Sequence, residues 1–143
     1  MKNLFETPEA PVINPIRILL VDDNPYFLEA ARDLLQLNQA IQVVAIATEG
    51  QDALIQVPAV NPDVILLDLN LGDQSGLALI PQFKKAEPGA KIIILTIMEE
   101  EPYRIAALQA GANAFVCKTQ MSKTLIPVIF ELTNSTDSKQ RGE

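Results

Sequence analysis

Four residues with chemically useful side chains each follow a short apolar run, at well-separated points of the chain. They are Asp23, Asp68, Thr96 and Lys118, and Asp22 directly precedes the first of them. Neighbouring carboxylates bind hard cations such as Mg²⁺, a carboxylate can attack phosphorus as a nucleophile, and an ammonium group can pair with a phosphoryl oxygen. The set predicts a site for a divalent cation and a phosphoryl group.

Each of these residues has its own predicted role. Asp68 is the predicted nucleophile, which would form an aspartyl phosphate, and Asp22 and Asp23 are expected to hold Mg²⁺. Lys118 would pair with one phosphoryl oxygen and the Thr96 hydroxyl would hydrogen-bond another. Each residue alone also fits an ordinary structural role. Their order at successive strand ends favours the functional interpretation.

The apolar runs indicate how the chain brings these side chains together. Near-continuous apolar runs predict strands buried on both faces, at 16–21, 43–47, 64–68, 92–96 and 114–117. Apolar residues at helical spacing predict helices between and after them, at 25–35, 50–57, 77–85, 102–110 and 124–132. The alternation predicts an α/β fold, a doubly wound, flavodoxin-like parallel sheet of five strands in the order 2-1-3-4-5. The carboxyl ends of such strands meet at one edge.

Prolines mark both agreements and conflicts in this pattern. Asn24 followed by Pro25 is a favoured helix start. Pro58, Pro81 and Pro127 fall within or at the ends of predicted helices, where a proline removes a hydrogen bond. We expect Pro127 to be tolerated in a first turn and Pro81 to mark a kink or a later start of its helix.

Composition bounds the class of protein. The chain has 143 residues, of which 48% are hydrophobic, enough for one domain with a sizeable core. Residues 1–14 are expected to form a flexible arm, 15–134 the folded domain, and 135–143 a polar tail or the start of a linker.

Charge and residue counts exclude several functions. The net charge of −7 disfavours direct binding of nucleic acid or of an anionic membrane. The sequence has no histidine, which excludes a serine–histidine triad and histidine-ligated zinc within this chain. A single cysteine, no spanning apolar run and no secretory signal lead us to expect a cytoplasmic location.

Several motifs taken together resemble the receiver domain of response regulators in two-component signalling. The resemblance covers about residues 16–133. It is carried by Ile-Leu-Leu-Val-Asp-Asp at 18–23, Pro-Asp-Val-Ile-Leu-Leu-Asp-Leu-Asn at 62–70, Gly76, Ile-Ile-Leu-Thr at 93–96 and Gly-Ala-Asn-Ala-Phe-Val-Cys-Lys at 111–118.

This resemblance implies a function and a set of ligands. Asp68 would accept phosphate from a partner's phosphohistidine, on a histidine kinase or phosphotransfer protein, or from small acyl phosphates. Asp23, Asp68 and the backbone carbonyl of Asn70 would ligate Mg²⁺, with Asp22 nearby through water. The chain would be a phosphorylation-dependent signalling module and not an enzyme, beyond self-phosphorylation and self-dephosphorylation.

The resemblance also implies a switch. Thr96 would move toward the phosphoryl group and the Phe115 ring would turn inward. The surface formed by helix 102–110, strand 114–117 and helix 124–132 would then change and contact a downstream output domain or protein. A homodimer through the fourth and fifth helices, or the first and fifth, is the implied assembly.

The chain departs from the family pattern at three positions. Gly72 and Thr119 stand where the family commonly has proline, and Ile97 follows Thr96 where a small residue is usual. A β-branched side chain at position 97 would crowd the phosphoryl group, so we expect slow self-dephosphorylation.

Three alternatives remain open from the sequence. The module could stand alone or be the receiver of a longer regulator with a helix-turn-helix output. A receiver-like interaction domain could act without phosphorylation. A small aspartate-nucleophile phosphatase is disfavoured, because such enzymes carry Asp-x-Asp where this chain has adjacent Asp22 and Asp23. The run Glu99-Glu100-Glu101 fits either a solvated turn or a docking feature.

Overall fold

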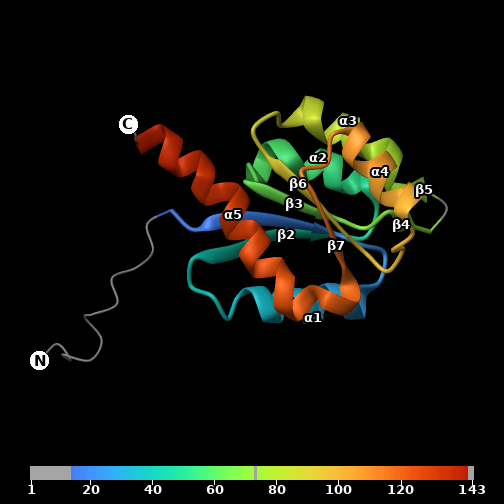
Figure 1. Ribbon diagram of the computed structural model, residues 1–143, viewed down its shortest axis with the longest axis horizontal. Helices are drawn as coiled ribbons and strands as arrows, with labels where there is room; N and C mark the ends of the chain where they lie inside the picture. Colours follow the sequence, from blue (N-terminus) through green and yellow to red (C-terminus); the bar gives the residue numbers. More distant parts are fainter. Residues whose placement is uncertain (1–13, 73, 142–143) are drawn as a thin grey trace, which may run out of the picture.

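A parallel sheet covered by helices on both faces forms the body of the protein (Figure 1). The computed structural model describes residues 14–72 and 74–141, so all but the last residue of the predicted arm lies outside it. The strands of the main sheet are β1 (Ile16–Val21), β2 (Ile41–Ala47), β3 (Val64–Leu67), β6 (Lys91–Thr96) and β7 (Ala114–Cys117). Their order is β2-β1-β3-β6-β7, which confirms the predicted fold class and strand order.

Helices connect the strands and also follow the last one. They are α1 (Pro25–Leu35), α2 (Gly50–Val60), α3 (Gly76–Ala86), α4 (Glu101–Ala110) and α5 (Met121–Arg141), with a short 3₁₀ turn, η1 (Lys118–Gln120), before α5. Two strands of two residues each, β4 (Asn70–Leu71) and β5 (Gln74–Ser75), pair with each other after β3. The sequence pattern did not indicate this small ladder.

Alternate residues of the central strands build two separate layers of core. In β1, Leu19 and Val21 pack toward α2, α3 and α4, whereas Ile18 and Leu20 pack toward α1 and α5. This alternation explains why the strand sequences are continuously apolar, because both faces of each central strand are covered.

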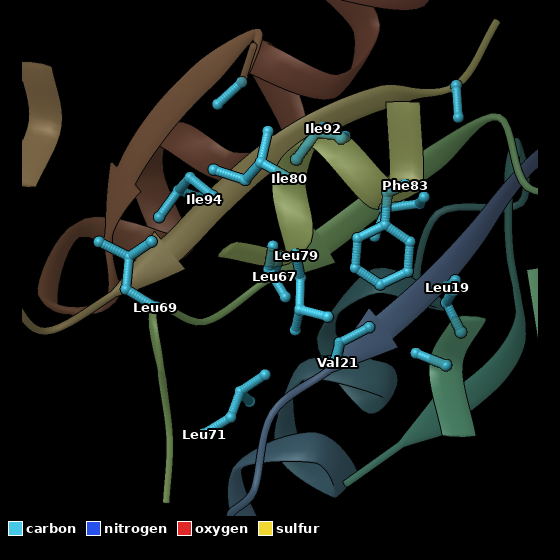
Figure 2. Close-up of a cluster of buried hydrophobic side chains, with 14 of the residues drawn as sticks. Leu19, Val21, Leu67, Leu69, Leu71, Leu79, Ile80, Phe83, Ile92 and Ile94 are labelled. Carbon is cyan, nitrogen blue, oxygen red and sulfur yellow. The ribbon is translucent and has the colours of Figure 1, made fainter. Parts of the chain in front are cut away.

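The larger core layer holds the strand ends in place. Figure 2 shows Leu79, Ile80 and Phe83 of α3 among side chains of β1, β3 and β6. Each large apolar side chain buried in this way contributes roughly 1.5–3 kcal/mol. Leu69 and Leu71, which follow β3, belong to the same cluster, so the loop after the third strand is anchored as well.

The structure contradicts the prediction for Pro127 and one of the two alternatives for Pro81, the late start of its helix. Helix α5 begins at Met121 and runs to Arg141, into the predicted tail, so Pro127 lies beyond its first turn. The turn η1 leads straight from β7 into this helix, which is why the start is earlier than the apolar spacing indicated. Helix α3 begins at Gly76, so Pro81 does not mark a late start.

Helix α2 continues past Pro58 to Val60, and the residue that caps it, Asn61, has a left-handed φ of 50°. Among the described residues, no helix has the length and apolar character needed to cross a membrane.

Candidate functional site

The predicted site residues stand at the carboxyl ends of four neighbouring strands. Asp22 follows β1, Asp68 follows β3, Thr96 ends β6 and Lys118 follows β7. The backbone N–H of Asp68 donates to the carbonyl of Val21 at 3.0 Å, which places the ends of β1 and β3 at the same level. The order of the strands therefore brings residues that are distant in the chain together in one cluster.

Three carboxylates meet in this cluster. Asp22, Asp23 and Asp68 each offer one oxygen, and these three oxygens lie within 4.8 Å of one another. Asp22 and Asp68 are 2% and 5% exposed, whereas Asp23 is exposed to solvent. Two carboxylates ~5 Å apart repel by roughly 3 kcal/mol at an effective dielectric constant of ~20. A cation is needed to offset this repulsion.

The side chain of Lys118 places one cation beside the two buried acids. Its Nζ lies 2.6 Å from Oδ2 of Asp22 and 3.2 Å from Oδ2 of Asp68. The lysine side chain is only 14% exposed. The same Nζ lies 3.9 Å from the centroid of the Phe27 ring. The ammonium group is therefore enclosed by two acids and an aromatic face.

The two oxygens of each buried acid have different neighbours. Oδ1 of Asp22 accepts a hydrogen bond from the backbone N–H of Asn24 at 2.9 Å, and Oδ1 of Asp68 accepts one from that of Asn70 at 3.2 Å. The Oδ2 atoms face Lys118. Apart from this ion pair, the buried Oδ2 of Asp22 has no hydrogen-bond partner in the described part of the chain. Backbone turns thus aim one oxygen of each acid into the cluster.

Burial raises the pKa of Asp22 above its ordinary value. The hydrogen bond and charge of Lys118 and the N–H of Asn24 oppose this effect, while the charge of Asp68 adds to it. A divalent cation at this position would favour the ionised carboxyl. Three carboxylates within reach of one ion match the oxygen ligands that Mg²⁺ prefers, so the residues present fit this metal.

Thr96 and Phe115 lie in the adjacent strands β6 and β7, and their contacts are with residues outside the cluster of acids. Thr96 is fully buried, and its Oγ1 accepts a hydrogen bond from the N–H of Met98 at 3.3 Å. Phe115, in β7, is half-buried and packs against the core layer that includes α3 and α4. The structure therefore groups the three acids with Lys118 directly, and places Thr96 at the end of the adjoining strand.

Two residues at this site received no role from the sequence. Phe27 looked like an ordinary member of the buried face of the first helix. Gly76 matched the family motif, and the structure gives a reason: a Cβ there would lie 2.3 Å from the carbonyl oxygen of Asp68 and 2.8 Å from Cα of Leu69. Only glycine allows α3 to begin so close to the chain that carries Asp68.

Comparison with known proteins agrees with this geometry. The family model of the response regulator receiver domain matches residues 18–130. The nitrate/nitrite response regulator protein NarP of Escherichia coli K12 is 34% identical over 119 residues, which cover 83% of this chain and 55% of that protein. The transcriptional regulatory protein DegU of Brevibacillus brevis is 30% identical over 81% of this chain and 49% of its own length.

A solved structure shares the same fold. The crystal structure of a LuxR-family two-component response regulator from Aurantimonas sp. SI85-9A1 superposes with a TM-score of 0.80 at 27% identity, covering 85% of this chain and 87% of that one.

The fold and the acidic pocket define a phosphoacceptor domain of two-component signalling. The chain belongs to the response regulator receiver family. It is a phosphorylation-dependent signalling module and not a classical enzyme, and a histidine kinase is the kind of partner that this family implies. The three acids form the kind of pocket in which receivers bind Mg²⁺. The chain spans about half the length of the relatives it matches, DegU and NarP.

Proposed function

We propose that Asp68 accepts a phosphoryl group from the phosphohistidine of a kinase or phosphotransfer protein, or from a small acyl phosphate. The observation that carries this proposal is the cluster itself, in which the Asp68 carboxylate has an ammonium group at 3.2 Å and two further acids around it. A carboxylate oxygen of Asp68 attacks phosphorus. The new O–P bond forms as the bond to the donor's nitrogen or oxygen breaks, which leaves an aspartyl phosphate.

The proposed metal ligands are Asp23, Asp68 and the backbone carbonyl of Asn70, with Asp22 acting through a water molecule. Mg²⁺ held there would offset the charge of the transferred phosphoryl group. The buried Oδ2 of Asp22 pairs with the Lys118 ammonium and has no other partner in the described part of the chain, so it can also accept a hydrogen bond from a water ligand. Lys118 would exchange a carboxylate oxygen for a phosphoryl oxygen.

The proposed switch changes the partner of one hydroxyl. Thr96 would release the N–H of Met98, which its Oγ1 contacts at 3.3 Å, and bond to the phosphoryl group instead. The Phe115 ring would turn inward into the vacated space. Helix α4 supports this proposal because Ala107 is its only fully buried residue, so little packing resists its displacement. Phosphorylation would shift a pre-existing equilibrium between the two states.

The surface formed by α4, β7 and α5 is the proposed output face. Ile105 and Leu108 of α4 are large apolar side chains exposed to solvent, which suits contact with an output domain, an output protein or a second copy of this chain. NarP and DegU are named as a response regulator and a transcriptional regulator, so we place this receiver in the same role, working in the cytoplasm. With a net charge of −7, this segment would not itself bind DNA.

Mass spectrometry after treatment with acetyl phosphate and Mg²⁺ tests the proposal. We expect one added phosphoryl group, which Asp68→Asn abolishes and EDTA prevents. Asp33→Asn, an exposed acid of α1, is the matched control and should leave the adduct in place. An unmodified but folded wild-type protein would instead favour a receiver-like interaction domain that acts without phosphorylation. Turnover of many phosphoesters would favour a phosphatase.

A further inference from the structure

The Lys118 ammonium group has a third neighbour besides the two carboxylates. Its Nζ lies 3.9 Å from the centroid of the Phe27 ring, within the range in which the negative face of an aromatic ring attracts a cation. The ring comes from α1, whereas the lysine follows β7 and the nearest acids follow β1 and β3. We propose that Phe27 is a positioning residue that holds the Lys118 ammonium beside Asp68. This inference rests on the proposed phosphoryl transfer.

Asn24, the N-cap residue of α1, forms hydrogen bonds with both the Phe27 backbone and the Asp22 carboxylate. The N–H of Phe27 donates to Oδ1 of Asn24 at 3.3 Å, and the N–H of Asn24 donates to Oδ1 of Asp22 at 2.9 Å. The ring also packs against the core layer that includes α1 and α5. Phe27 is therefore held by its backbone and by its side chain, and its position is tied to that of the carboxylate that pairs with Lys118.

An aromatic ring suits this task for a physical reason. Lysine carries its charge on a flexible four-carbon chain, so the ammonium group needs contacts that restrict it. The ring attracts the cation without accepting a classical hydrogen bond and without neutralising its charge. When a phosphoryl group forms on Asp68, the ammonium can exchange a carboxylate oxygen for a phosphoryl oxygen while keeping its contact with the ring. A leucine at position 27 would fill similar space but lack this attraction.

Rates of phosphorylation by acetyl phosphate at saturating Mg²⁺ form the first test. A cation–π contact of ordinary strength corresponds to about twofold to thirtyfold in an equilibrium constant, so Phe27→Leu should slow the reaction within that range. Phe27→Tyr keeps the ring and should recover most of the wild-type rate. In a Lys118→Met background, Phe27→Leu should cause no further loss. Equal losses in the leucine and tyrosine variants, or the same loss without Lys118, would overturn the inference.

Unfolding of the metal-free protein in EDTA is the second test and needs no phosphorylation. In a double-mutant cycle, Phe27→Leu and Lys118→Met should couple by at least about twofold in the unfolding equilibrium constant. Phe130→Leu is the matched control, because Phe130 packs against the same core layer from α5. It should be additive with Lys118→Met. If Phe27→Leu and Lys118→Met are also additive, the inference is wrong. Failure of wild-type phosphorylation alone would count only against the proposed function.

Discussion

The orientation of the Asp22 and Asp68 carboxylates depends on backbone N–H groups that lie beside them. Both acids stand out in the sequence because they follow apolar strands, and the structure places them in one cluster, as their order at the strand ends indicated. Phe27 did not stand out, because its helical spacing is that of any buried residue in α1. Its contact with Lys118 depends on the approach of β7 and η1 to α1, and no local pattern of residues records that approach.

Ile97 should control the lifetime of the phosphorylated state. The residue directly follows Thr96 and is 67% exposed, at the edge of the sheet where water would reach the phosphoryl group. Its branched side chain is stiff, so Ile97→Ala should open the approach of water and shorten the half-life of the phosphorylated protein severalfold.

Loss of the adduct over time, followed by mass spectrometry, measures this effect. Ile55→Ala removes another exposed isoleucine, on α2, and should not change the half-life. A half-life unchanged in Ile97→Ala would show that access of water is governed elsewhere.

The secondary structure was predictable wherever apolar periodicity was strong. All five main strands were expected within two residues of their observed ends, because each is an apolar run bounded by polar residues. Helix α5 was harder to predict, since it starts from the 3₁₀ turn at Lys118 and continues past residue 132, where the apolar spacing stops. The ladder of β4 and β5 has only two residues per strand and thus no period to detect.

Pro81 should cost stability within α3. It is the sixth residue of the helix, so the carbonyl of Leu77 lacks the N–H that an ordinary residue would donate. Because Pro81 is exposed, alanine fits without repacking. Pro81→Ala should raise the free energy of unfolding by about 1–2 kcal/mol, after allowing for the greater freedom of the unfolded chain.

Chemical denaturation measures this change. Pro102 lies in the first turn of α4, where its missing N–H has no partner to lose. Pro102→Ala should therefore stay within about 0.5 kcal/mol of the wild type. Destabilisation by Pro81→Ala would mean that the proline ring is better accommodated than the loss of its hydrogen bond indicates.

At the scale of the whole molecule, two core layers support a single functional edge. Both layers pack against β1, β3 and β6, so the strand ends that carry Asp22, Asp68 and Thr96 belong to the most buried part of the fold. Metal binding at this edge should raise the free energy of unfolding of the whole domain, because the three acids come together only in the folded chain.

Mg²⁺ should therefore raise the unfolding temperature. Binding to the folded state alone contributes about 2.7 kcal/mol when the ion is present at ~100 times its dissociation constant. Asp23→Asn should reduce this effect, whereas Asp52→Asn, an exposed acid of α2, should retain it. Thermal melts with and without EDTA measure the difference. An equal response in both variants would place the ion away from the pocket.

The ion pair between Lys118 and the two buried acids has a further consequence. Because the Lys118 ammonium group is covalently part of the chain, its concentration beside the acids does not depend on the surrounding solution. When divalent ions are scarce, the protein would stay folded but would not accept a phosphoryl group. Their return would restore responsiveness at once, with no need to rebuild the molecule.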